Sequence, residues 1–197
     1  MWANLTTDAG RHAWLALAAL LCAGTGGVLL GTLAACVAPC RAPILGLAAL
    51  GRTLPSIALL MLLIPLVGVG APPAIIALTL LALPPIVVNV DLGIRGTPAA
   101  ALDAATGLGM TALQRFARIV VPHALPVSIA GLRTAAVEVI GSATLATFIG
   151  AGGLGDDIVR GLQTGDTTLL VAAAALVAAM AFAAELVLDQ LARVTAA

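Results

Sequence analysis

The chain has 197 residues, of which 61% are hydrophobic and only 9% are charged, and its formal net charge is zero. Soluble domains carry about a quarter charged residues, so a soluble protein of this composition would have too few polar side chains to cover its surface. All nine basic residues are arginines and they form no basic run, which argues against nucleic-acid binding. We expect a single integral-membrane domain over residues 1–197.

Five apolar segments are long enough, or nearly so, to cross a bilayer as helices, which takes roughly 20 residues. In chain order they cover residues 13–37, 54–69, 73–90, 126–149 and 168–188, and a short helix over 44–50 can precede the second. Glycine and alanine inside these segments favour close helix–helix approach. The sequence therefore predicts an all-α polytopic bundle of about five transmembrane helices.

The arginines set the orientation, because positive residues concentrate in cytoplasmic loops. With the N-terminus outside and the C-terminus inside, seven arginines lie on the inner side: Arg41, Arg52, Arg95, Arg115, Arg118, Arg133 and Arg193. Only Arg11 and Arg160 then lie outside. We expect Arg133 to extend toward the inner interface, and Asn89 and Asp91 to mark the end of the third span.

The inner loop over residues 91–125 is far longer than a plain connector between helices needs. A helix-forming run over 99–106 is followed by Gly109, which permits a tight turn. Thr111 is placed to cap a second helix, which Pro122 is expected to end. The pattern predicts a cytoplasmic helix–turn–helix.

Apolar residues recur at helical spacing on the second of these helices. Leu113, Phe116 and Ile119 form a ridge on one face, with Arg115 and Arg118 beside it. Such a loop can pack on the bilayer surface as an ordinary amphipathic segment, or it can dock a separate protein.

The loop resembles the same loop of binding-protein-dependent ABC importer permeases, which carries Glu-Ala-Ala, three residues, Gly, nine residues and Ile-x-Leu-Pro. The matching residues here are Asp103, Ala104, Ala105, Gly109, Ile119 and Pro122. The spacing is kept throughout, with aspartate in place of glutamate and valine in place of leucine. The resemblance implies that this loop, with Leu113 and Phe116, is the coupling helix that inserts into a groove of a separate ATPase and transmits its closure.

Other segments are similar to permeases of the osmoprotectant type, and the similarity covers about residues 51–165. They are residues 53–59, 64–70, Asn89, 131–135 and 148–155. The resemblance implies a multi-pass permease of the bacterial plasma membrane for glycine betaine, carnitine, choline or a related solute. It also implies three partners: an ABC ATPase, an extracytoplasmic solute-binding protein and a second permease subunit, identical or different. ATP would be bound by the ATPase, and no cofactor by this chain.

Glu138 lies about midway along the fourth span, with Ser142 one turn further on. A charge at that depth costs about 2.5–3.5 kcal/mol on insertion scales, so it should face protein or water. Both residues are candidates for the translocation path, where a carboxylate suits a cationic ammonium group. The alternative is a structural role, with Glu138 paired to a neighbouring helix or to an arginine of a second subunit.

The segment after the fourth span is rich in glycine. Gly150, Gly152 and Gly155 formally match a dinucleotide fingerprint, but that pattern requires a strand before it and a helix after it. Together with Gly153 they instead predict a flexible outer turn that closes the path or receives the solute-binding protein. A merely structural turn remains open.

Three competing functions follow from the same residues. A permease of this architecture for methionine or another small solute is the nearest alternative. An ion-coupled carrier would use Glu138 as its binding carboxylate. A membrane-embedded enzyme or a metal site would need converging His, Asp, Glu or Cys residues, and the sequence indicates none. The few aromatics cannot easily build a cage for quaternary ammonium, so solute recognition is expected mainly in the binding protein.

Overall fold

The computed structural model describes residues 2–196, and its side chains are described for residues 5–195. Every regular element in this range is a helix. In chain order the elements are α1 (Trp2–Cys36), α2 (Ala38–Gly51), α3 (Ser56–Val67), α4 (Ala71–Arg95), α5 (Ala99–Gly107), α6 (Ala112–Arg115), the π-helix η1 (Phe116–Val120), α7 (Val121–Ala143), the 3₁₀-helix η2 (Thr144–Ile149), α8 (Leu154–Thr164) and α9 (Thr167–Ala196).

Four helical segments are long and apolar enough to cross a membrane. They are Leu5–Cys36, Ala71–Arg95, Ala112–Ile149 and Thr167–Thr195. Helices α2 and α3 pass the same test as a pair, although they are bent by 101° at the break between them. The predicted all-α bundle of about five membrane helices is therefore confirmed, with one of the five divided.

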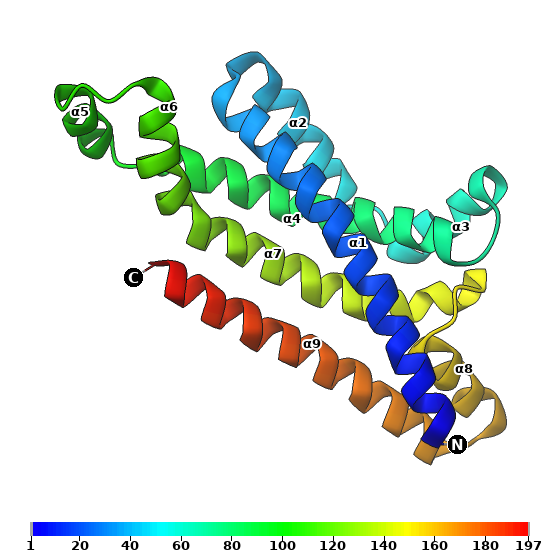
Figure 1. The fold of residues 1–197 in the computed structure, drawn as a ribbon. Coiled ribbons are helices and arrows are strands. Elements are labelled where there is room, and N and C mark those ends of the chain that lie inside the picture. Colours follow the sequence, from blue (N-terminus) through cyan, green and yellow to red (C-terminus); the bar gives the residue numbers. More distant parts are fainter. Residues whose placement is uncertain (1, 197) are drawn as a thin grey trace.

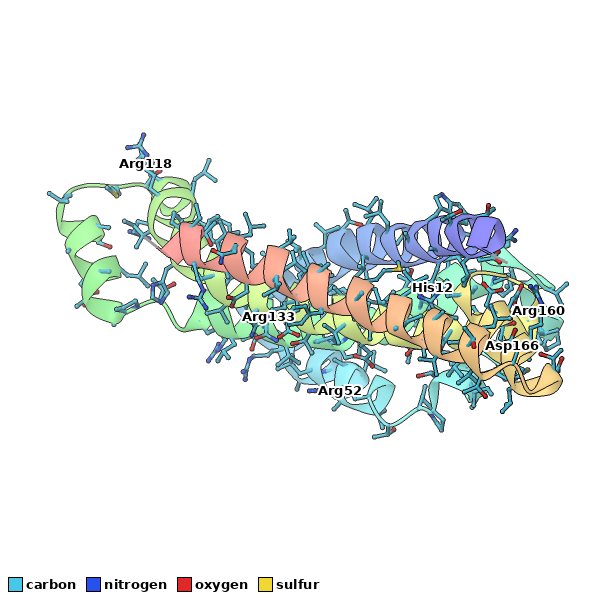
Figure 2. All side chains as sticks on the ribbon, turned by 90° about the horizontal axis from the view of Figure 1, so that it is seen from below. His12, Arg52, Arg118, Arg133, Arg160 and Asp166 are labelled. Carbon is cyan, nitrogen blue, oxygen red and sulfur yellow. The ribbon has the colours of Figure 1, made fainter. Side chains whose placement is uncertain are left out.

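The divided span is where the expected and observed helices differ most. Sequence reasoning placed one continuous helix over 54–69, whereas α3 has only 12 residues and is too short to cross alone. Pro55 has extended backbone angles directly before α3, because its ring fixes φ and it cannot continue a helix from α2. The break leaves Arg52 midway along the molecule, between Arg118 at one end and Arg160 at the other (Figure 2), and not in an inner loop.

The long helices lie side by side and give the molecule two distinct ends (Figure 1). Helix α7 runs between α4 and α9, and α1 crosses over them. The N-terminus and α8 lie at one end, whereas α5, α6 and the C-terminus lie toward the other. This arrangement agrees with an N-terminus and a C-terminus on opposite sides of the membrane. The main core cluster is formed by small and branched residues of α1, α4 and α7.

Close contact between α1, α4 and α7 depends on glycine. A Cβ atom added at Gly31 of α1 would lie 2.6 Å from the Cβ of Val90 and 2.9 Å from the Val87 carbonyl oxygen of α4. A Cβ added at Gly131 of α7 would lie 2.7 Å from the Pro85 carbonyl oxygen. These distances leave no room for a side chain, so the helices approach as closely as backbones allow.

Helix α4 continues past the residues expected to end it. Asn89 and Asp91 lie inside α4, which ends at Arg95. The Asn89 side-chain amide donates to the Pro85 carbonyl at 2.8 Å. The buried carboxylate of Asp91 accepts from Arg41 Nη2 at 3.0 Å and from Nε at 3.2 Å. The Arg41 guanidinium of α2 compensates the negative charge of Asp91, so this carboxylate can be buried inside α4.

Alanine at position 31 should destabilise the bundle. Gly31→Ala places a methyl group against Val90 and Val87, and overpacking of this kind typically costs about 1–3 kcal/mol. We expect a lower melting temperature for the detergent-solubilised chain. Gly24→Ala, in the same helix with no atom within 4 Å of the new Cβ, is the matched control and should leave stability unchanged or slightly raised. Equal effects of the two changes would contradict the packing described.

Candidate functional site

The helix–turn–helix at one end, residues 99–115, is called the coupling knuckle below. Its first helix, α5, ends in a Schellman motif. The Met110 N–H donates to the Ala105 carbonyl at 3.1 Å, and the Gly109 N–H donates to the Thr106 carbonyl at 2.9 Å. Gly109 has φ of +74°, a conformation that side chains rarely adopt. The expected glycine turn is therefore present and has one defined geometry.

The second helix of the knuckle begins with a reciprocal cap. The Gln114 N–H donates to Thr111 Oγ1 at 3.3 Å, while the Thr111 N–H donates to Gln114 Oε1 at 2.8 Å. Arg115 then donates to Thr106 Oγ1 of α5 at 3.0 Å. The prediction that Thr111 caps this helix is confirmed. Caps and the arginine contact together hold the two helices as one rigid unit.

The residues of the family pattern occupy different environments on the knuckle. Asp103, Ala104 and Gly109 are exposed, whereas Ala105 is buried. Leu113 is 77% exposed, and Leu108 at the turn is 79% exposed. Two leucines thus project into solvent at the tip of the knuckle. Sequence reasoning did not include Leu108, although its place between two turn glycines was a usable signal.

The expected ridge of Leu113, Phe116 and Ile119 does not form one exposed face. Phe116 and Ile119 are half-buried, and Phe116 lines a cavity of about 230 Å³ against α1, α4 and α7. The reason is the π-helix over Phe116–Val120, whose wider turn changes the direction of successive side chains. The knuckle therefore presents Leu113 to solvent and directs Phe116 toward the bundle.

Pro122 does not end the second helix. The Val121 N–H donates to the Phe116 carbonyl five residues earlier, and Pro122 lies in the first turn of α7. The widened π-helical turn accommodates Pro122, which has no N–H to donate and whose ring crowds the carbonyl of the preceding turn. The helical segment Ala112–Ile149 consequently continues for 38 residues, about 57 Å at 1.5 Å per residue. It exceeds the bilayer core of about 30 Å.

At the opposite end, the predicted outer turn is held in place by neighbouring segments. Gly150, Gly152 and Gly153 all have positive φ, and residues 151–155 are buried. Arg11 Nε donates to the Ala151 carbonyl at 2.6 Å. The Gly70 N–H donates to the Ile149 carbonyl at 2.7 Å, which ties the α3–α4 connection to the same turn. The turn is compact and anchored.

Two buried polar side chains, His12 of α1 and Asp157 of α8, lie at this end of the molecule. His12 is buried in α1, with Nε2 2.9 Å from the Ile140 carbonyl oxygen of α7. Asp157 of α8 is buried, and its Oδ1 accepts from Arg160 Nη1 at 3.3 Å. Burial raises the pKa of the Asp157 carboxyl above its ordinary value, and the nearby carboxylate of Asp8 raises this pKa further. Nothing in the sequence indicates the His12 contact, because Ile140 lies 128 residues further along the chain.

Glu138 and Ser142 lie on the face of α7 next to the break between α2 and α3. The hydroxyls of Ser142 and Ser56 are 3.4 Å apart. Glu138 is exposed and lines a surface hollow of about 370 Å³ together with Arg133, Thr134, Val137 and Glu185. Polar and charged groups of three segments therefore gather on one exposed face of the bundle.

Arg133 does not extend freely to the inner interface. Its Nη1 donates to Asp189 Oδ1 of α9 at 2.7 Å, and Asp189 also accepts from Arg193. This network joins α7 to α9. Among the described residues, no group of three or more His, Cys, Asp or Glu side chains is arranged to hold a metal ion.

Known proteins resemble the chain over nearly its whole length. It is 37% identical over 188 residues to the carnitine transport permease protein OpuCB of Listeria monocytogenes, covering 95% of this chain and 86% of that one. It is 38% identical over 160 residues to the glycine betaine/carnitine/choline permease OpuCB of Bacillus subtilis, covering 81% and 74%. The inward-facing MetNI methionine ABC transporter matches with a TM-score of 0.84 and 22% identity, covering 97% of this chain and 95% of that chain. This last likeness concerns the fold alone.

The bundle and its projecting knuckle have the fold of an ABC importer permease subunit. Residues 27–196 match the family described as binding-protein-dependent transport system inner membrane component, and the chain belongs to this family. It is accordingly a multi-pass protein of the inner membrane and a transport subunit.

The buried carboxyl of Asp157 should give the protein a measurable pH dependence. Because its folded pKa is raised, its contribution to stability is greatest below the ordinary pKa and is lost as pH rises through the folded pKa. Asp157→Asn should therefore raise the melting temperature at pH values above this titration and flatten the decrease in melting temperature as pH rises through it. Asp103→Asn, at an exposed site, is the control. An unchanged pH slope in Asp157→Asn would refute the assignment.

Proposed function

We propose that this chain forms, together with a second permease subunit, the translocation path for a quaternary-ammonium compatible solute, and that a separate ATPase drives the transport. The solute class is supported by the two OpuCB relatives, whose names specify carnitine and glycine betaine/carnitine/choline transport. The second subunit can be a copy of this chain or a related one. ATP binds to the ATPase, and this chain requires no cofactor.

The coupling knuckle is the docking site for the ATPase in this proposal. Leu108 and Leu113 leave most of their surface in solvent on a part of the chain that projects beyond the membrane helices (Figure 1). Exposed leucines at the tip of a rigid unit suit insertion into an apolar groove. Asp103 is exposed on α5 of the same knuckle and can pair with a basic side chain of the partner.

The observation that carries the proposal is the continuity of the helical segment Ala112–Ile149. This segment begins in the knuckle, crosses the bilayer, passes Glu138 and Ser142, and ends at the outer turn. A displacement of the knuckle is therefore transmitted along one element to the opposite end of the path. Rigid-body movement of this kind is an established way to convert a local event into a distant one.

The outer end is the expected docking side for an extracytoplasmic solute-binding protein. The anchored turn of Gly150, Gly152, Gly153 and Gly155 lies there with α8. Exposed aromatic side chains are sparse and scattered, with Trp14, Phe148 and Phe182 among them. The binding protein would then make most of the selection, and the permease would provide a weakly binding path.

Two other functions have narrower support. A methionine permease is suggested by the MetNI fold, but at 22% identity this similarity does not extend to the solute. An ion-coupled carrier is suggested by Glu138 alone, since an exposed carboxylate in a span can bind a coupling ion. The two are separated from the proposal by which solute is taken up and by whether ATP is required.

Replacing the tip leucine should uncouple the permease from its ATPase. Leu113→Asp places a charge in the proposed apolar groove, and we expect association to weaken at least tenfold, as for central contacts of protein interfaces. Asp103→Arg should weaken association as well. Co-purification of the ATPase and its solute-stimulated hydrolysis provide the measurement. Leu162→Asp, at a leucine of similar exposure on the opposite side, is the control for co-purification of the ATPase. Full association in both knuckle variants would show that the docking site is elsewhere.

Transport in proteoliposomes should require ATP and the binding protein. We expect uptake of labelled glycine betaine or choline by the complete transporter when ATP is supplied on the ATPase side, and no uptake of labelled methionine. Uptake driven by a proton gradient without the ATPase would favour the carrier, and uptake of methionine alone would favour the other permease class.

A further inference from the structure

The break between α2 and α3 brings an arginine to the middle of the membrane domain. Arg52 and Thr53 follow the last residue of α2, and the chain bends there by 101° before α3 starts at Ser56. Figure 2 shows Arg52 about halfway along the bundle, at the edge of the molecule. Its side chain is exposed. A break in a span thus places a positive charge at a depth where such charges are rare and functional.

Helix α7 contributes a negative charge, that of Glu138, near the break that holds Arg52. The contact between Ser56 and Ser142 holds the break against α7, and Glu138 lies one turn before Ser142. Arg52 lies four residues before Ser56 in the break, so the same contact brings the two charged residues to the same part of the bundle. The four ion pairs of the described residues do not include these two, so both side chains keep their charged ends free.

Both charges point out of the bundle and not into its core. Glu138 lines the hollow that Arg133, Thr134 and Glu185 share, where Arg133 is already paired with Asp189, and Arg52 is exposed. Because lipid tails solvate neither charge, this face must border water or another protein. In a two-subunit transporter it therefore faces the path or the second subunit. This step rests on the proposed function.

We propose that Arg52 and Glu138 form a transient binding site for a zwitterionic solute in the path. The Arg52 guanidinium takes the solute carboxylate, to which it can donate two parallel hydrogen bonds. Glu138 takes the quaternary ammonium group, which has no N–H and is held by charge attraction. A solute with separated opposite charges satisfies both residues at once. A purely cationic solute engages only Glu138.

This role accounts for two exposed, opposite charges in the same part of the bundle that form no ion pair with each other. A closed Arg52–Glu138 pair would have to be broken by each solute molecule, whereas an open pair accepts it directly. Contacts that are satisfied by the solute and then released suit a path, where binding must be weak enough for the solute to leave.

The test compares a zwitterion with a cation in the same complete transporter. With ATPase, binding protein and both permease subunits in proteoliposomes, uptake of labelled glycine betaine and labelled choline is measured for the wild type, Arg52→Gln, Arg52→Lys and Glu138→Gln. Arg52→Gln should lower glycine betaine uptake by roughly tenfold to a hundredfold, the usual effect of losing a charged hydrogen bond, and leave choline uptake within about twofold. Arg52→Lys should restore part of the loss. Glu138→Gln should lower uptake of both solutes.

Arg193→Gln is the matched control, because Arg193 is an exposed arginine whose pair with Asp189 lies on the surface of α9. The proposal is overturned if Arg52→Gln lowers both solutes in the same proportion, or lowers neither. ATPase activity stimulated by the loaded binding protein shows in each variant that the complex is assembled. If the wild type takes up neither solute, it is the proposed solute class that fails; a selective loss appears only when both proposals hold.

Discussion

A charged side chain exposed at the middle of a membrane must meet water or protein, and the arrangement of this permease follows from that constraint. Four charges inside the helices are satisfied within the chain: Arg41 pairs with Asp91, and Arg133 pairs with Asp189. Arg52 and Glu138 remain free on one face. The satisfied pairs join neighbouring helices, whereas the free pair identifies the face that cannot lie against lipid.

The packing of the bundle allows a movement of the coupling knuckle to reach that face. Glycines at close contacts pack α1, α4 and α7 backbone to backbone, so these helices move together more readily than they separate. The segment Ala112–Ile149 joins the coupling knuckle, the charged face and the outer turn in one helix. The outer turn is anchored by Arg11, which is why it is better regarded as a fixed end than as a flexible flap.

Local signals predicted local structure well. The knuckle could be predicted because its turn and cap depend on residues close together in the sequence. Gly109 adopts the positive φ of the turn, and Thr111 caps the second helix together with Gln114, three residues later. Contacts between residues far apart in the sequence could not be predicted in this way. Asp91 was expected at a helix end because its partner Arg41 lies fifty residues earlier. Arg52 was assigned to an inner loop because hydropathy does not reveal a bend inside a span. Pro122 was expected to end a helix that a π-turn in fact continues.

The most direct test of the charged face is its access to water. In the assembled transporter, with Cys22, Cys36 and Cys40 replaced by alanine, single cysteines are introduced by Glu138→Cys and Leu21→Cys and exposed to a hydrophilic, membrane-impermeant thiol reagent. Leu21 is an exposed leucine of α1 on a wholly apolar stretch. The account predicts rapid labelling at position 138 and little labelling at position 21. Labelling at 138 that is no faster than at 21 would contradict it.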